Sequence, residues 1–201
     1  MMPRLCPAPR LILVCSLVLA VLTVADVRAA DRGGRPGAAD GGPGGVYANI
    51  PPRDEFGRDQ LAMFREWNPD PIGRHQANLQ AIDPALAAVV RKVEADHPGL
   101  RFVIGSGLRG EALQRKAVAW GWSGTPDSPH RAGQAVDLWP LDDRGRVLFD
   151  PAAQARIAAA MKQAAAALGV RIRWGGTFRG FRHGDRSHFE LVRAGAAGPA
   201  R

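Results

Sequence analysis

Residues 128–137 read SPHRAGQAVD and residues 185–190 read DRSHFE. Together the two runs supply His130, Asp137 and His188, which are two imidazoles and one carboxylate. Three protein ligands of these types are typical of catalytic zinc sites, because they leave the fourth tetrahedral position of the metal to water. The two runs therefore predict a zinc site that does chemistry rather than one that only stabilises the fold.

Asp185 stands three residues before His188, where its carboxylate could take the proton from a water that zinc acidifies to a pKa of about 7. After it the side chains alternate, so in a strand His188 and Glu190 share one face while Phe189 points to the other. Glu190 is then placed to accept a hydrogen bond from an imidazole and to orient it. This spacing predicts a hydrolase that activates water, with Asp185 as its base.

Helix starts and apolar runs predict the fold class. The pairs Asp83-Pro84 and Asp150-Pro151 each combine a capping carboxylate with proline at the first helical position. We expect helices over 83–97, 111–120 and 151–168, strands over 100–104, 134–139, 170–174 and 188–192, and a return strand over 146–149 that forms a hairpin. This irregular order predicts an α+β fold, a small antiparallel sheet flanked by helices, with the zinc site in a cleft at the sheet.

The first 29 residues have the features of an export signal. Arg4 and Arg10 precede an uncharged run over residues 11–25, and Val27-Arg28-Ala29 offers small residues to a signal peptidase. A membrane anchor is the alternative, but the run is shorter than the roughly 20 apolar residues of a spanning helix. We expect cleavage after Ala29, no stable membrane insertion of the remaining chain, and a location outside the cytoplasm, with the periplasm favoured over full secretion.

The rest of the chain divides into one domain with two unstructured ends. Residues 30–46 are nearly all Gly, Ala, Pro, Asp and Arg, a composition that buries too little apolar surface to offset the entropy of ordering. We expect a flexible leader there, a disordered tail over 194–201 and a single domain over 47–193. Large apolar side chains recur at near-helical spacing early in this domain, namely Phe56, Met63, Phe64 and Trp67. They predict a helical extension that packs on the main domain.

The chain carries a formal net charge of +8, and loss of residues 1–29 would leave +6, because three arginines and one aspartate go with them. This charge favours an anionic partner outside the cytoplasm, such as cell wall or acidic lipid. We do not expect nucleic acid as a partner, because no groove-reading motif or interleaved aromatic stripe accompanies the arginines. Cys6 and Cys15 lie within the expected signal, so we expect the core and the metal to stabilise the domain without disulfides.

Four segments carry a resemblance to a known family. They are Ser106-Gly107-Leu108-Arg109 with Gln114, the run at 128–137, the Trp174-Gly175-Gly176 turn and the run at 185–190. Together they resemble the zinc peptidases of bacterial cell-wall peptide, the family of D-alanyl-D-alanine carboxypeptidases and L-alanyl-D-glutamate endopeptidases, which has a hedgehog-like zinc peptidase fold. The resemblance covers residues 83–192.

This resemblance implies roles for individual residues. His130, Asp137 and His188 would bind zinc, Asp185 would be the general base, and Arg109 would face the scissile carbonyl or a substrate carboxylate. Three further residues are expected to steady the ligands or to position the substrate, namely Ser128, Glu190 and Trp174.

We therefore expect an exported, monomeric zinc metallopeptidase that hydrolyses an amide bond in peptidoglycan stem peptides. L-alanyl-D-glutamate endopeptidase activity is favoured, because the aspartate base and the Trp-Gly-Gly turn resemble those enzymes more than the carboxypeptidases, whose base is usually glutamate. Two alternatives stay open: a D-alanyl-D-alanine carboxypeptidase or dipeptidase, and a non-catalytic zinc-containing module that binds the cell wall. His183, just before Asp185, is a further candidate proton donor.

Overall fold

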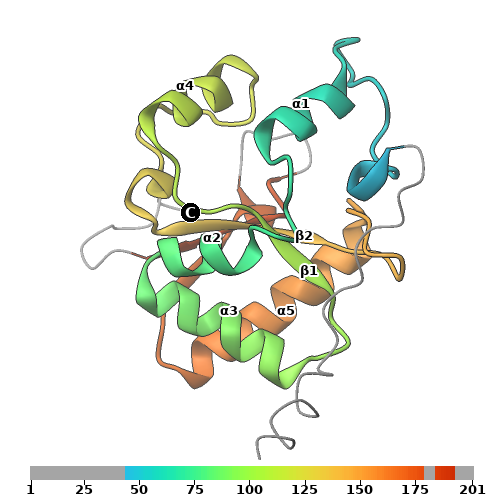
Figure 1. Ribbon diagram of the computed structural model, residues 1–201. Coiled ribbons are helices and arrows are strands. Elements are labelled where there is room, and N and C mark those ends of the chain that lie inside the picture. The colour runs from blue at the N-terminus through green and yellow to red at the C-terminus, as the bar shows by residue number, and fades with distance from the viewer. Residues whose placement is uncertain (1–43, 179–183, 193–201) are drawn as a thin grey trace, which may run out of the picture. The chain divides into compact units, whose positions relative to one another are not determined.

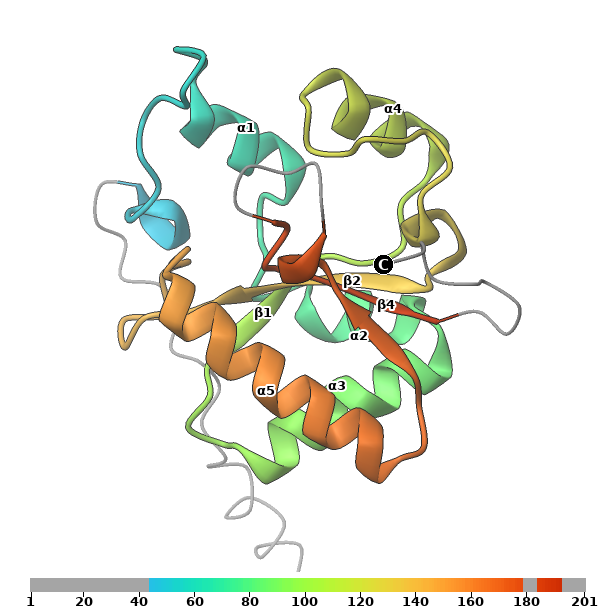
Figure 2. The ribbon, with the colours of Figure 1, turned by 180° about the vertical axis from the view of Figure 1, so that it is seen from behind.

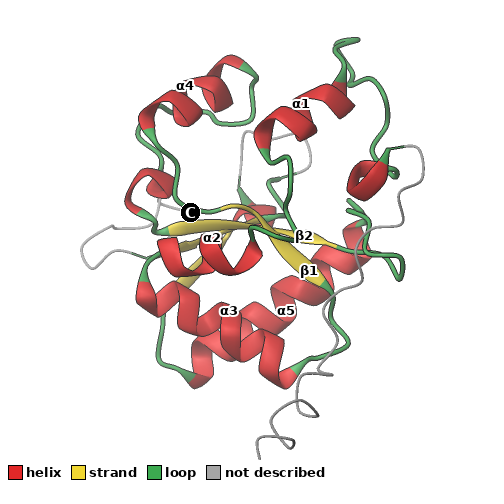
Figure 3. Ribbon diagram, in the orientation of Figure 1, coloured by secondary structure: helices red, strands yellow, loops and turns green. Residues whose placement is uncertain are grey.

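The structure is a computed structural model and describes residues 44–178 and 184–192. The expected signal, almost all of the expected leader, His183 and the expected tail lie outside these residues. The helices and strands (Figures 1 and 3) are α1 (Gln60–Trp67), α2 (His75–Ala81), α3 (Pro84–Asp96), β1 (Phe102–Ser106), α4 (Glu111–Ala119), β2 (Ala135–Pro140), α5 (Pro151–Ala167), β3 (Ile172–Trp174) and β4 (His188–Leu191). Of the helices that the structure describes, none is long and apolar enough to cross a membrane.

Carboxylates cap three of these helices. Oδ1 of Asp83 accepts a hydrogen bond from the amide of Ala85 (2.9 Å), and Oδ1 of Asp150 accepts one from the amide of Ala153 (2.7 Å). Asp59 caps α1 in the same way. Each carboxylate satisfies an amide that a helix start leaves without a backbone partner. Helices α3 and α5 accordingly begin and end within one residue of their predicted bounds. Helix α4 does so too, although it begins after Gly110 without a side-chain cap.

The four strands form one antiparallel sheet in the order β1-β2-β4-β3. Helices α3 and α5 cover one face of it (Figures 1 and 2), and Ile104, Leu138 and Phe189 are buried in the core between them. Alternate residues of β2 and β4 point to the other face, over which α1 and α4 stand (Figure 2). The predicted α+β fold with a small antiparallel sheet flanked by helices is therefore confirmed.

A second core forms on the face below α1 and α4. Tyr47, Phe64 and Trp67 of the N-terminal part pack there with Val103 of β1 and Trp139 of β2. Two of these rings, Tyr47 and Trp139, lie edge to face with their centroids 6.2 Å apart. The helix predicted in this part is present as α1, and it contributes to the core of the domain.

Several details differ from the sequence predictions. Helix α2 is not among the predicted helices, and β1 covers Phe102–Ser106 where a strand over 100–104 is expected. The spacing predicts that Phe56 packs with the other apolar side chains of the extension, but Phe56 lies in the turn before α1 and is 74% exposed. Residues 146–149 form no strand, and a single bridge joins Leu141 to Val147. At this turn the Asp142 carboxylate accepts hydrogen bonds from the amides of Arg144 and Arg146, at 2.9 Å each. Backbone bonds from the amide of Asp142 to the carbonyl of Arg146 (2.8 Å) and from the amide of Leu148 to that of Pro140 (2.9 Å) return the chain beside β2 without a second strand.

Strand β1 contains a bulge at Gly105. The pairing of β1 with β2 shifts between Ile104 and Ser106, so Gly105 is the extra residue and Ser106 pairs with Asp137. A Cβ atom at Gly105 would lie 1.9 Å from Cε2 of Trp139, so glycine alone leaves room for the indole. The bulge thus brings Ser106 beside Asp137 while Trp139 lies against the bare backbone.

Candidate active site

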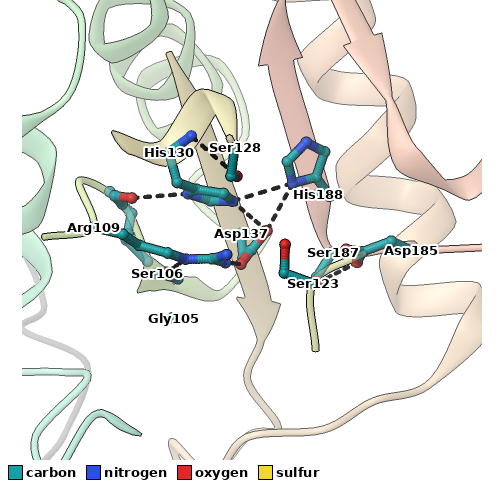
Figure 4. A network of polar contacts seen from close by, with 12 residues as sticks. Gly105, Ser106, Arg109, Ser123, Ser128, His130, Asp137, Asp185, Ser187 and His188 are labelled. Atoms are coloured by element: carbon teal, nitrogen blue, oxygen red, sulfur yellow. Dashed lines mark hydrogen bonds and ion pairs between the residues drawn. The ribbon is translucent and has the colours of Figure 1, made fainter. Parts of the chain in front are cut away.

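Three side chains meet on the face of the sheet that α1 and α4 overlook. Asp137 of β2 and His188 of β4 are direct cross-strand partners, and His130 lies in the short 3₁₀ helix Pro129–Ala132 just before β2. Figure 4 shows the three side chains pointing toward one another. Nδ1 of His188 lies 3.1 Å from Oδ1 of Asp137, Nε2 of His130 lies 3.3 Å from the same oxygen, and the two nitrogens are 3.2 Å apart.

These separations suit a tetrahedral metal ion. Ligand atoms about 2.0–2.1 Å from a zinc ion at tetrahedral angles lie about 3.3 Å from one another. The three protein atoms form a triangle with sides of 3.1 to 3.3 Å, and all three residues are buried. The side chains named as ligands from the sequence are therefore together, and their donor set and spacing fit zinc.

A second hydrogen bond orients each imidazole. Nδ1 of His130 lies 2.8 Å from the carbonyl oxygen of Gly107, and Nε2 of His188 lies 2.9 Å from Oε2 of Glu190. These outer nitrogens face acceptors and so carry the protons, which leaves the lone pair of the inner nitrogen facing the triangle. Nε of Arg173 donates to the other oxygen of Glu190 (2.7 Å), so this carboxylate is held from two sides.

Arg109 is buried beside the triangle. Its Nη2 donates to Oδ2 of Asp137 (2.5 Å), its Nε to Oγ of Ser106 (2.7 Å) and its Nη1 to Oε1 of Gln114 (3.4 Å). The guanidinium also lies over the ring of Trp67, 5.1 Å from the ring centroid. These contacts hold Asp137 in place, while the expected contact of Arg109 with substrate stays a prediction.

The electrostatics of the site favour a cation within the triangle. Burial alone would raise the pKa of Asp137, but the neighbouring His130 and Arg109 outweigh it and hold this pKa well below its usual range. Burial lowers the pKa of His188, yet its hydrogen bonds to Asp137 and Glu190 raise that pKa to about 9. The carboxylates that favour a proton on His188 would likewise favour a metal ion bound to the inner nitrogen of this imidazole in place of the proton.

Asp185 lies at the edge of the same site, in the segment that leads into β4 (Figure 4). Oγ of Ser187 donates to its Oδ1 at 3.0 Å. Burial raises the pKa of Asp185, and the negative charge of Asp137 raises it further. A carboxyl with a raised pKa gains and gives up a proton more readily near neutral pH than an exposed one does.

Two further predicted residues hold the backbone around the site. Nε1 of Trp174 donates to the carbonyl oxygen of Arg186 (2.9 Å), which ties the Asp185 segment to the end of β3. Oγ of Ser128 accepts a hydrogen bond from the amide of His130 (3.4 Å) and caps the 3₁₀ helix that carries this imidazole. Both side chains thus act on the positions of neighbouring residues.

A cavity of about 240 Å³ opens beside these groups. Its polar wall includes Arg109, Asp137, Asp185 and Ser187. Its aromatic wall consists of Phe64, Trp67, Trp122, Trp139 and Phe149. A polar end next to a large apolar wall is typical of a site that binds a small organic group and reacts with it.

Sequence reasoning did not connect α1 with this site. The spacing of Phe64 and Trp67 predicts burial, but periodicity says nothing about which distant residues they meet. Trp67 contacts Arg109 only after the chain has folded α1 over β2, so no pattern of neighbouring residues in the sequence predicts this contact. Arg173 was missed for a similar reason, because strand pairing sets its partner Glu190. Ser187 is a neighbour of its partner Asp185 in the chain, but the sequence does not reveal where a hydroxyl in this turn points.

Comparisons with known proteins agree with this geometry. The family of phage L-alanyl-D-glutamate peptidases matches residues 72–194. The crystal structure of the L-Ala D-Glu endopeptidase ChiX of Serratia marcescens is similar, with a TM-score of 0.54 and 34% sequence identity over 59% of this chain and 86% of that chain. Among curated protein sequences, none matches. The matched segment contains all the metal-ligand candidates and Asp185, and the chain belongs to the L-alanyl-D-glutamate peptidase family.

Proposed function

We propose that this protein is an exported zinc endopeptidase that hydrolyses the amide bond between L-alanine and D-glutamate in the stem peptides of peptidoglycan. The observation that carries the proposal is the buried triangle of His130, Asp137 and His188 with Asp185 beside it, in a chain of this peptidase family. The bond in the name of the Serratia relative supports the choice of bond. The arginine-flanked apolar run near the N-terminus supports export. The proposal includes action in the periplasm as a monomer.

The ligand atoms follow from the hydrogen bonds. His130 would bind zinc through Nε2, His188 through Nδ1 and Asp137 through Oδ1, because their other polar atoms are engaged by Gly107, Glu190 and Arg109 respectively. When bound, zinc supplies positive charge that polarises the scissile carbonyl and acidifies the attacking water.

The residues of the chain then move one proton. The carboxylate of Asp185 takes it from the water as the water attacks the carbonyl carbon of L-alanine. The same carboxyl group returns it to the nitrogen of D-glutamate as the amide bond breaks, which releases a neutral amine. Ser187 fixes the orientation of this carboxylate through Oδ1, and Arg109 keeps Asp137 from rotating away from the ligand triangle.

The test is mass spectrometry of purified peptidoglycan fragments after digestion by the zinc-loaded protein, the metal-free protein and the Asp185→Asn variant. We expect fragments with a new N-terminal D-glutamate from the zinc-loaded protein alone. Asp185→Asn should keep one zinc per chain and lose about 10²- to 10⁴-fold in kcat. Asp142→Asn, a carboxylate in a turn that does not line the cavity, is the matched control and should keep full activity.

Other outcomes would redirect the assignment. Release of terminal D-alanine in place of the internal cleavage would make the protein a carboxypeptidase. No cleavage by a protein that holds stoichiometric zinc would favour a non-catalytic module that binds the cell wall.

A further inference from the structure

One wall of the cavity beside the ligand triangle is aromatic. It combines Phe64 and Trp67 of α1 with three rings of the main domain, Trp122, Trp139 and Phe149. Asp137 and Asp185 line the same cavity of about 240 Å³. A group bound against the rings therefore lies in the same cavity as the Asp185 carboxylate that moves the proton in the proposed reaction.

The rings form one packed cluster that still offers surface to a ligand. The Phe64 centroid lies 5.1 Å from that of Trp122, 5.3 Å from that of Trp139 and 5.4 Å from that of Phe149. Phe149 is nevertheless 39% exposed and Trp122 is only half-buried. Rings that are already held by their neighbours lose little conformational entropy when a ligand covers them, so such a surface is well suited to binding.

We propose that this aromatic wall binds the sugar that carries the stem peptide, so that the enzyme prefers glycan-linked peptide over free peptide. The inference rests on the proposed function. In peptidoglycan the amino group of L-alanine is joined through a lactyl group to a muramic acid ring, which places this sugar close to the scissile bond on its amino side. The C–H groups on the faces of a sugar ring are slightly positive and pack on the negative faces of aromatic rings.

The groups on the carboxyl side of the scissile bond suit this wall less well. D-glutamate carries an ionised carboxylate near neutral pH, and such a group is costly to bury against hydrocarbon. Among the described residues that line the cavity, Arg109 is the only cation, and Asp137 already engages it. The wall therefore also sets the direction of the substrate, with the sugar against the rings and D-glutamate leading away from them.

Two substrates that differ only in the sugar test the inference. One is an N-acetylmuramoyl stem peptide, and the other is the same peptide with a D-lactoyl group on the L-alanine nitrogen. We expect the zinc-loaded wild-type protein to cleave the first with a kcat/KM about ten-fold higher or more, as one well-filled contact surface commonly gives. Phe149→Ala and Trp122→Ala should each lower this preference ratio several-fold.

A control variant and a binding measurement complete the test. Phe56→Ala removes an exposed ring of the same N-terminal part that does not line the cavity, so both kcat/KM values and their ratio should stay at the wild-type level. Chemical-shift changes of the tryptophan indole N–H signals on titration with the amide of N-acetylmuramic acid, whose lactyl group is uncharged as in peptidoglycan, report binding without turnover. We expect the Trp122 signal to move in the wild-type protein and the sugar affinity to fall in Phe149→Ala.

The outcomes separate this inference from the proposed function. If wild-type protein with bound zinc cleaves neither substrate, the proposed function fails. If it cleaves both with equal kcat/KM, or if the ratio is unchanged in Phe149→Ala and Trp122→Ala proteins that retain their fold, the sugar site is refuted and the peptidase stands.

Discussion

Replacing Gly105 by alanine would place a methyl group inside the ring of Trp139. The added carbon would lie 1.9 Å from Cε2 and 2.0 Å from Cδ2 of the indole. Ordinary contacts between carbon atoms are about 3.5–4.0 Å, so the ring would have to move by about 1.5–2 Å. The atoms that it meets belong to the centre of the ring and not to the flexible end of a side chain.

Two neighbouring aromatic rings oppose that movement. Trp139 is buried, and its ring lies edge to face with those of Phe64 (5.3 Å between centroids) and Phe149 (5.9 Å). Overpacking of a well-packed core costs about 1–3 kcal/mol, and we expect the upper end here, about 3 kcal/mol of unfolding free energy. For a domain of this size that loss corresponds to a fall in Tm of about 6–12 °C.

Urea unfolding of four proteins would measure this effect: wild type, Gly105→Ala, Trp139→Leu and the double variant. Leucine at position 139 removes the ring that clashes, so Gly105→Ala should cost less than about 1 kcal/mol in that background. The coupling energy between the two changes should then exceed about 1.5 kcal/mol. If Gly105→Ala lowers the unfolding free energy equally in both backgrounds, the inference that Gly105 makes room for the indole of Trp139 is refuted.

Three further predictions follow from contacts around the site. Glu190→Ala leaves Nε2 of His188 without its acceptor, so the zinc Kd should rise about ten- to hundred-fold, measured by competition with a chromophoric chelator. Zinc at a free concentration of about 100 times its Kd should raise the unfolding free energy by about 2.7 kcal/mol, and a chelator should reverse the gain in calorimetry. Burial raises the pKa of Asp142, but hydrogen bonds from Asn49 and Arg146 outweigh it and lower that pKa to about 2. Its carboxylate therefore stabilises the fold above the unfolded pKa of about 3.9, and this contribution is lost as the pH falls toward 2. Asp142→Asn should lower the stability at pH 7, and the difference from wild type in urea unfolding should shrink as the pH falls from 4 to 3; a difference that is constant with pH would contradict the assignment.

Local chemistry explains which parts of the fold were predictable from sequence. The helix starts at Asp83 and Asp150 depend on a carboxylate and a proline that are adjacent in the chain, and the structure has both. The alternation around Asp137 and His188 depends on the strand period, and both residues do lie on one face as cross-strand partners. Such signals involve only a few neighbouring residues, so they are visible before the tertiary structure is known.

The features that the sequence did not reveal depend on distant contacts. Phe56 and Phe64 are the same residue type and equally hydrophobic. Phe56 lies in solvent because α1 begins only at Gln60, after Phe56 in the chain. The partner of Arg109 likewise depends on the bulge at Gly105, which brings Ser106 and Asp137 together. A resemblance in motif places an arginine near the metal, but it does not say whether the guanidinium binds the substrate or a ligand carboxylate.

The N-terminal part of the domain connects the aromatic wall of the cavity to the candidate metal ligands. Residues 44–71 lie outside the segment that the peptidase family matches, yet Trp67 both lines the cavity and packs on the guanidinium of Arg109. A cation–π contact shielded from water contributes about 2 kcal/mol, and this one holds the arginine that in turn holds Asp137. A change at Trp67 that alters the aromatic wall is therefore expected to loosen Asp137 as well. Substrate preference can be altered more freely at Phe149, whose ring lines the same wall and packs on Phe64 and Trp139. Trp122 is less free, because its ring packs on that of Trp67 with 5.2 Å between the centroids.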